Sequence, residues 1–75
     1  MSNQNSDVQV LRINDVIAIT GLSRSSIYNK INLKSSYYDK NFPKSFKLGL
    51  RTIGWLKRDI EHWIKMLKES ENDTE

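Results

Sequence analysis

The chain of 75 residues has no cysteine, one proline, three glycines and one histidine. Without cysteine it can form neither a disulfide framework nor a thiolate metal site, and a reducing cytoplasm is the expected location. Its apolar runs are only a few residues long, and it begins with the polar stretch MSNQNSD, which has no basic or hydrophobic leader. We therefore expect neither a secretory signal nor a membrane span.

The same scarcity argues against catalysis. His62 has no second histidine at metal-ligand spacing, and the scattered glycines form neither a phosphate-binding loop nor a dinucleotide fingerprint. Several serines are present, but no base and orienting partner stand with them in a recognisable arrangement. The sequence thus predicts a non-enzyme without cofactor or metal, built as one small domain with a modest core.

Positive charge is concentrated in the middle of the chain. Between Thr20 and Arg58 there are nine Lys and Arg residues against one acid, Asp39, which gives +8, whereas the two flanks together carry −5. A basic segment of this kind favours a polyanionic partner such as nucleic acid. The alternative is a lysine-rich surface that only keeps the protein solvated.

Residues 13–31, INDVIAITGLSRSSIYNKI, predict two short amphipathic helices joined at a glycine. Asn14 is suited to N-cap a first helix over about residues 15–20, and Ser23 is suited to N-cap the second. Gly21 stands where the first helix must end and the chain must turn, a position that favours positive φ. This pattern is typical of a helix-turn-helix, although an ordinary helical hairpin would share it.

The second helix should have one buried and one polar face. At 100° per residue, Ile27 and Ile31 point inward, and the outward side chains are those of Ser25, Tyr28, Asn29 and Asn32. Such side chains suit DNA base edges, because Asn can pair bidentately with adenine and Ser can donate or accept. Arg24 lies at the edge of the buried face, from which its long side chain can reach a phosphate or a guanine.

The segments on either side of these helices are less regular. Residues 8–13 alternate loosely and predict a short strand, and a turn-rich loop of about a dozen residues follows Ile31. In that loop we expect Tyr37 and Tyr38 to pin the chain to the core; stacking on bases is the alternative. Lys40 and Lys44 are candidates for phosphate contacts.

Residues 45–55, SFKLGLRTIGW, predict a β-hairpin that turns through Gly49, Leu50 and Arg51. Four apolar residues are expected to face the core, namely Phe46, Leu48, Ile53 and Trp55. Lys47 and Arg51 should then lie at the exposed edge and tip. A basic hairpin beside a helix-turn-helix is a wing, which commonly reaches phosphates or the minor groove; a purely structural hairpin is the alternative.

The last helix has the clearest periodicity, with Ile60, Trp63, Ile64 and Leu67 at i, i+3, i+4 and i+7. We expect about twelve helical residues, a weak start because Leu56 is a poor N-cap, and a frayed acidic tail. The expected organisation is a flexible tail over residues 1–9, one domain over residues 10–68, and a tail over residues 69–75.

In several segments the sequence resembles the AlpA-like prophage regulatory proteins, whose winged helix-turn-helix is similar to that of MerR-type regulators and phage excisionases. The resemblance rests on Leu11-Arg12-Ile13, TGLSRSSIY from Thr20, FPKSFKLGLRTIGW from Phe42 and DIEHWI from Asp59. It covers about residues 11–67. The loop after the second helix is longer than in many relatives, and Leu56 stands where many have a capping residue.

The resemblance implies an α+β, mainly α domain with three helices and a two- to three-stranded β wing. It implies a regulator of integrase expression or of excision that binds double-stranded DNA, with neighbouring copies of itself or a phage integrase as further partners. On this chain the motif supplies a reading helix through Arg24, Ser25, Ser26 and Tyr28, and a wing through Lys47 and Arg51. From their position we add Asn29 and Lys30 to the helix and Lys44 to the wing.

Three other functions stay open from the sequence. The protein could be an excision factor that bends DNA. It could instead be an interaction module that binds an integrase or host protein through the last helix. RNA binding through Tyr37 and Tyr38 is the third, although stacking platforms usually present aromatic residues on a sheet.

Overall fold

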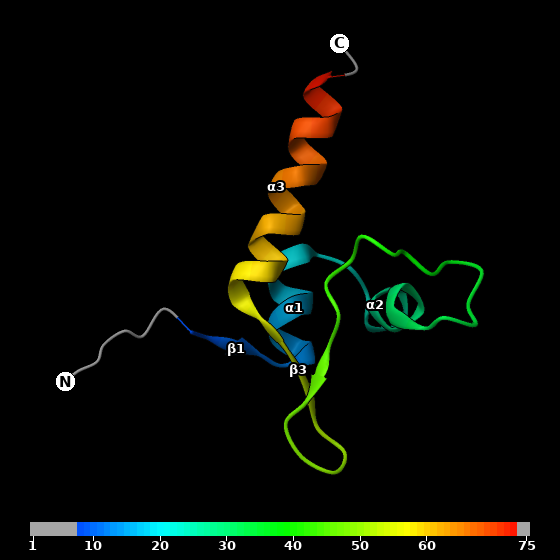
Figure 1. Cartoon of the computed structure of the whole chain (residues 1–75), viewed down its shortest axis with the longest axis vertical. Coiled ribbons are helices and arrows are strands. Elements are labelled where there is room, and N and C mark those ends of the chain that lie inside the picture. Colours follow the sequence, from blue (N-terminus) through cyan, green and yellow to red (C-terminus); the bar gives the residue numbers. More distant parts are fainter. Residues whose placement is uncertain (1–7, 74–75) are drawn as a thin grey trace, which may run out of the picture.

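The computed structural model describes residues 8–73. In chain order the elements are β1 (Val10–Leu11), α1 (Ile13–Thr20), α2 (Arg24–Ile31), β2 (Phe46–Lys47), β3 (Ile53–Leu56) and α3 (Lys57–Asp73). Figure 1 shows α3 rising from the body, with α2 beside α1 and the hairpin of β2 and β3 projecting at the opposite end. The mainly helical α+β architecture with three helices and a three-stranded sheet is confirmed. The predicted tail segments 1–7 and 74–75 lie outside the described residues.

A small core joins nearly all the elements. It consists of seven buried side chains, of which β1, α1, α2, the loop after α2 and β3 each supply one and α3 supplies two: Leu11, Val16, Ile27, Phe42, Trp55, Ile60 and Trp63. Phe42 meets Trp63 edge-to-face, with ring centroids 4.8 Å apart, a favoured arrangement for aromatic pairs. Strand β2 supplies none of these buried residues.

The sheet is antiparallel with the strand order β1-β3-β2, so β3 is central. Leu11 lies opposite Trp55, and Phe46 lies opposite Gly54. Opposite residues share a face and neighbours along a strand alternate, so Phe46 lies on the face away from Trp55. The prediction that Phe46 and Leu48 face the core is therefore wrong: they are 40% and 43% exposed.

The first helix begins two residues earlier than expected. Its N-cap is Arg12, whose backbone N–H donates to Oδ2 of Asp15 at 2.9 Å, and a carboxylate in the first turn also suits the helix dipole. The predicted N-cap, Asn14, is instead inside α1, and its side chain is free to accept a hydrogen bond from another element.

Helix α3 has 17 residues, more than the predicted twelve, and it includes residues 69–73 of the expected frayed tail. Strand β3 leads directly into it, and the Lys57 backbone N–H donates to the Gln9 carbonyl at 2.8 Å, which partly replaces the N-cap that Leu56 cannot provide. Lys57 and Glu61 also form an i,i+4 ion pair at 3.9 Å. Good helix formers such as Glu and Lys extend the helix past the core, so Leu67 is exposed.

Gly54 offers a test of the sheet. A Cβ at this position would lie 2.8 Å from Cγ1 of Val10, 2.9 Å from Cδ1 of Leu48 and 3.1 Å from the Leu11 carbonyl oxygen, whereas a Cβ on Gly49 would meet nothing within 4 Å. We expect Gly54→Ala to lower the free energy of unfolding by about 1–3 kcal/mol through overpacking, measured by urea denaturation. Gly49→Ala is the matched control, and equal losses from both variants would contradict this account.

Candidate nucleic-acid interface

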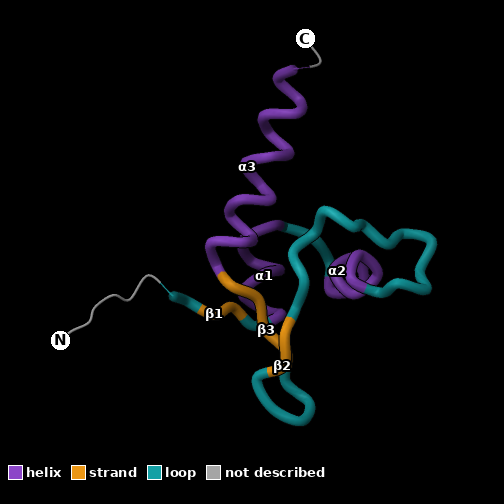
Figure 2. Tube along the Cα trace, in the orientation of Figure 1, coloured by secondary structure: helices purple, strands orange, loops and turns teal. Residues whose placement is uncertain are grey.

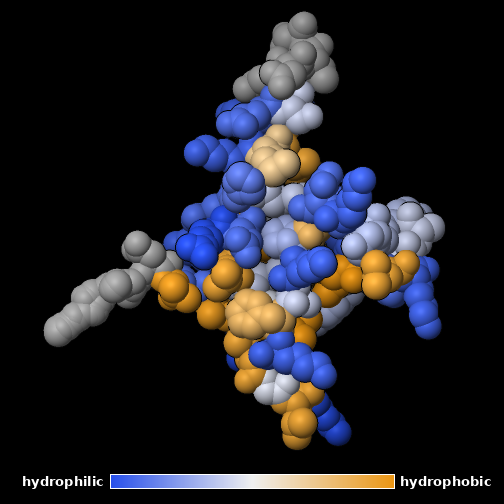
Figure 3. All heavy atoms as spheres, in the orientation of Figure 1, coloured by the Kyte–Doolittle hydropathy of each residue, from blue (hydrophilic) through white to orange (hydrophobic). Residues whose placement is uncertain are grey.

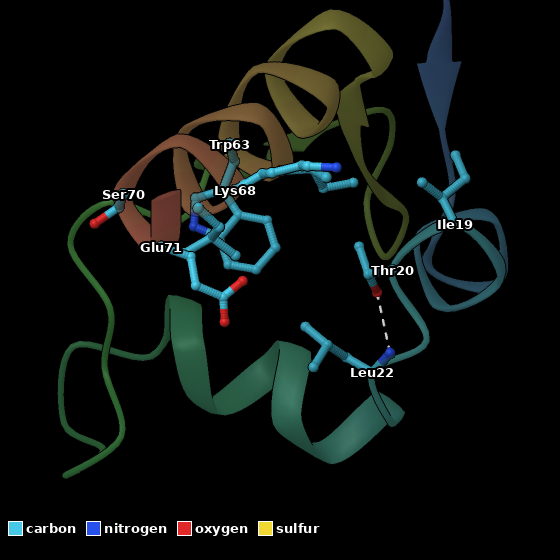
Figure 4. Close-up of a pocket in the computed structure, with 9 residues that line it drawn as sticks. Ile19, Thr20, Leu22, Trp63, Lys68, Ser70 and Glu71 are labelled. Atoms are coloured by element: carbon cyan, nitrogen blue, oxygen red, sulfur yellow. Dashed lines mark hydrogen bonds between the residues drawn. The ribbon is translucent and has the colours of Figure 1, made fainter. Parts of the chain in front are cut away.

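The turn between α1 and α2 is held by hydrogen bonds of its own residues. The Thr20 hydroxyl donates to the Val16 carbonyl at 2.7 Å and accepts from the Leu22 backbone N–H at 3.1 Å; the second bond is drawn in Figure 4. Gly21 has φ of +77°, and its N–H donates to the Ile17 carbonyl at 2.8 Å. The predicted glycine turn is confirmed, and it fixes where α2 leaves α1.

The start of α2 follows the predicted cap. Ser23 Oγ accepts from the Ser26 backbone N–H at 3.1 Å, and the Ser23 hydroxyl donates to Ser26 Oγ at 3.0 Å. Ser26 is thereby tied to the cap. Ile27 is fully buried, so the opposite face of the helix points outward, with Ser25 and Tyr28 exposed.

Arg24 is oriented by a neighbour that the sequence did not indicate for this role. Its Nη2 donates to Oδ1 of Asn14 at 2.8 Å, and both residues are exposed. The bond joins the first turn of α2 to α1 and leaves the other guanidinium N–H groups available. Asn14 was predicted only as a cap, because a contact between two helices has no local sequence signal.

Two predicted contact residues are engaged within the fold. Asn29 is half-buried, and its Oδ1 accepts from the Ser35 hydroxyl at 3.3 Å. Lys30 Nζ lies 3.6 Å from Oδ2 of Asp39 and 5.6 Å from the centre of a Trp63 ring. Lys30 therefore links α2 to the following loop and to α3.

Hydrogen bonds of Asp39 and Pro43 hold the long loop to the rest of the fold. The Asp39 backbone N–H donates to the Lys30 carbonyl at 3.0 Å, and Trp55 Nε1 donates to the Pro43 carbonyl at 3.2 Å. Tyr37 is 73% exposed, so the prediction that it pins the loop is wrong.

Tyr37 instead lines a hollow of about 320 Å³ with Ser26, Asn29 and Lys30. It thus lies beside the outward face of α2, a position that loop composition did not reveal. Tyr38 is less exposed and lines a second hollow with Ile31 and Phe42.

The wing has the predicted turn and basic residues. The Leu48 and Gly49 backbone N–H groups donate to the Thr52 carbonyl at 2.7 and 3.3 Å, which closes the hairpin. Lys47 and Arg51 are exposed, and Lys44 is exposed just before β2. Figure 2 shows the wing projecting from the body, with α2 to one side and α3 leading away from both.

A groove of about 780 Å³ lies at the other end, between α3 and the α1–α2 turn. In Figure 4 the α3 residues Trp63 and Lys68 face Ile19 and Leu22 across it. Within residues 8–71 no polar or charged side chain is buried. The described part of the chain contains no group of three or more His, Asp or Glu placed to hold a metal ion, and none of its helices has the length and apolar character needed to span a membrane.

Comparison with known proteins places this arrangement in a family. Residues 9–68 match the family of the prophage CP4-57 regulatory protein AlpA. The chain belongs to this family. It is 42% identical over 62 residues to the DNA-binding transcriptional activator AlpA of Escherichia coli K12, a match that covers 83% of this chain and 89% of that relative. No solved structure gives a match.

The contacts of Lys30 lead to a prediction about stability. We expect Lys30→Ala to lower the free energy of unfolding by up to about 1 kcal/mol, because it removes a partly exposed ion pair and a cation–π contact. Lys34→Ala, which changes an exposed lysine in the same region, should cost less in the same urea titration. Indistinguishable midpoints for the two variants would show that the Lys30 contacts contribute nothing.

Proposed function

We propose that this protein is a sequence-specific regulator of transcription that binds double-stranded DNA. The name of its Escherichia coli relative describes that protein as a DNA-binding transcriptional activator. In this proposal α2 enters the major groove and the wing lies along the adjacent backbone or minor groove. The observation that carries it is an outward polar face on a helix fixed by the turn and by buried Ile27, next to a projecting basic hairpin. Such a regulator acts in the bacterial cytoplasm.

The residues divide into readers and clamps. Ser25 and Tyr28, with Asn29 beside them, are proposed to contact base edges, while Arg24, Lys44, Lys47 and Arg51 contact phosphates or the minor groove. Ser26 and Lys30 are proposed to act through the fold, because their contacts hold the helix cap and the following loop.

The target gene is proposed from the family. A prophage regulatory protein of this size fits a regulator of integrase expression on a prophage or integrative element, and an excision factor that bends DNA is the second candidate. A single small module covers only about 600–1,000 Å² of DNA-binding surface, so we expect several copies on neighbouring sites. A footprint of one short site with no cooperativity on titration would argue against that arrangement.

Sequence reading can be tested on Ser25. Selection of bound duplexes from a random pool, read by mobility shift, should give a defined site, and Ser25→Ala should relax preference at one base pair by about 1–3 kcal/mol. Ser36→Ala, on the exposed loop, is the matched serine control. If the wild-type protein shifts no duplex at low salt, or shifts single-stranded RNA in preference, the proposed function is wrong.

Clamping can be tested on Lys47. Because each phosphate contact releases counterions, Lys47→Ala should weaken binding to every duplex and reduce the slope of log affinity against log salt by about one. Lys68→Ala, on α3 at the groove away from the wing, should leave the slope unchanged. A loss confined to one sequence would place Lys47 among the readers instead.

A further inference from the structure

Apolar side chains follow the outer face of the wing to its tip. Phe46 in β2 and Leu48 just after it lie on the face of the hairpin away from the core, and Leu50 follows at the turn with 97% of its surface exposed. Figure 3 shows this hydrophobic run reaching the lower end of the molecule, with strongly hydrophilic groups next to it. A single exposed leucine is ordinary, but an apolar series bordered by charge marks an interaction surface.

The fold covers Phe46 and Leu48 only in part and leaves Leu50 almost fully exposed. Strand β2 supplies nothing to the core and is paired only with β3. The hairpin is closed at its end by the bonds to the Thr52 carbonyl, so Leu50 stands at the furthest point of a short, closed loop. Lys47 lies on the opposite face of β2, across from Ile53, and Arg51 is adjacent to Leu50.

We propose that Leu50 is a wedge that enters the minor groove of the bound duplex and unstacks one base step. This inference rests on the proposed function. Leucine is among the apolar side chains that proteins insert between base pairs, an insertion that unstacks the step and kinks DNA by about 20–90°. Arg51 and Lys47 hold the phosphates on either side of the groove. Pyrimidine–purine steps are the easiest to unstack, so the parted step is of that type.

Charge favours DNA over a protein as the occupant. Lys47 and Arg51 suit a polyanion, and residues 44–58, which include the wing, contain no acidic residue. The acids Asp59, Glu61 and Glu69 lie on α3, which leads away from the wing (Figure 1), and Asp15 and Asp39 lie in α1 and in the long loop. Helix α2 lies to one side of the projecting wing (Figure 2), and in this proposal a duplex read by α2 also meets the tip. A protein partner would need an apolar surface for Leu48 and Leu50 and acidic groups for Lys47 and Arg51 at the same time.

The test uses the full chain and the duplex enriched from the random pool, labelled at both ends for energy transfer. The wild-type protein should bend this duplex. Leu50→Ala should lose most of the bend, but its affinity should fall by less than about tenfold because the phosphate contacts remain. Leu50→Phe should keep the bend. 2-Aminopurine placed at successive positions should brighten at one pyrimidine–purine step, and that signal should vanish with Leu50→Ala. Leu33→Ala, which changes another exposed leucine, is the matched control and should alter neither readout.

The outcomes separate this inference from the function on which it rests. If the wild-type protein binds the duplex but Leu50→Ala leaves the bend and the 2-aminopurine signal intact, the wedge is refuted and DNA binding stands. A variant that loses only cooperativity between adjacent copies would make Leu50 a contact between copies and overturn the wedge as well. Failure of the wild-type protein to bind any duplex would remove both proposals. Equal urea midpoints for all four proteins exclude unfolding as the cause.

Discussion

Seven buried side chains hold the described chain together, and most of its elements are attached to the rest through one of them. Trp63 is the centre of this arrangement, because it packs edge-to-face on Phe42 from the loop and lies beneath Lys30 from α2. A buried tryptophan removes about 200 Å² from water, which corresponds to about 5 kcal/mol. Its Nε1 is buried without a hydrogen-bond partner in the described structure, so packing rather than polar bonding accounts for its place.

So small a core makes the positions of α2 and the wing depend on different interactions. Helix α2 is fixed by Ile27 in the core, by the Ser23 cap and by the bonds of Thr20 and Gly21 in the turn before it. Strand β2 and the turn of the wing supply no buried side chain and are attached through the pairing of β2 with β3. The family segments follow this division: TGLS contains the turn and the cap, and Phe42-Pro43 returns the chain to both tryptophans. TGLS and Phe42-Pro43 are thus structural in the main, and most of the residues proposed to contact DNA follow them within the same family segments.

Features encoded locally were predictable from the sequence. The Ser23 cap, the positive φ of Gly21, the hairpin turn at residues 49–51 and the inward side of α2 each depend on residues a few positions apart. The features that were predicted wrongly depend on contacts between residues far apart in the sequence. Phe46 and Leu48 alternate as core residues would, but only the pairing of Phe46 with Gly54 shows which face they occupy. The roles of Asn14 and Lys30 depend on partners in other elements, which spacing along the chain does not reveal.

Because α2 and the wing are attached to the core through different contacts, substitutions in one need not affect the other. Under the proposed function, a substitution on the outward face of α2 would alter which bases are contacted without touching Ile27. A substitution at residues 48–51 would alter the wing without replacing any of the seven buried side chains. Effects at sites without shared partners are usually additive. Sequence preference and the shape imposed on the duplex would then vary independently on one fold, whereas changes at Trp63 or Phe42 would disturb both, because the loop and α3 pack together there.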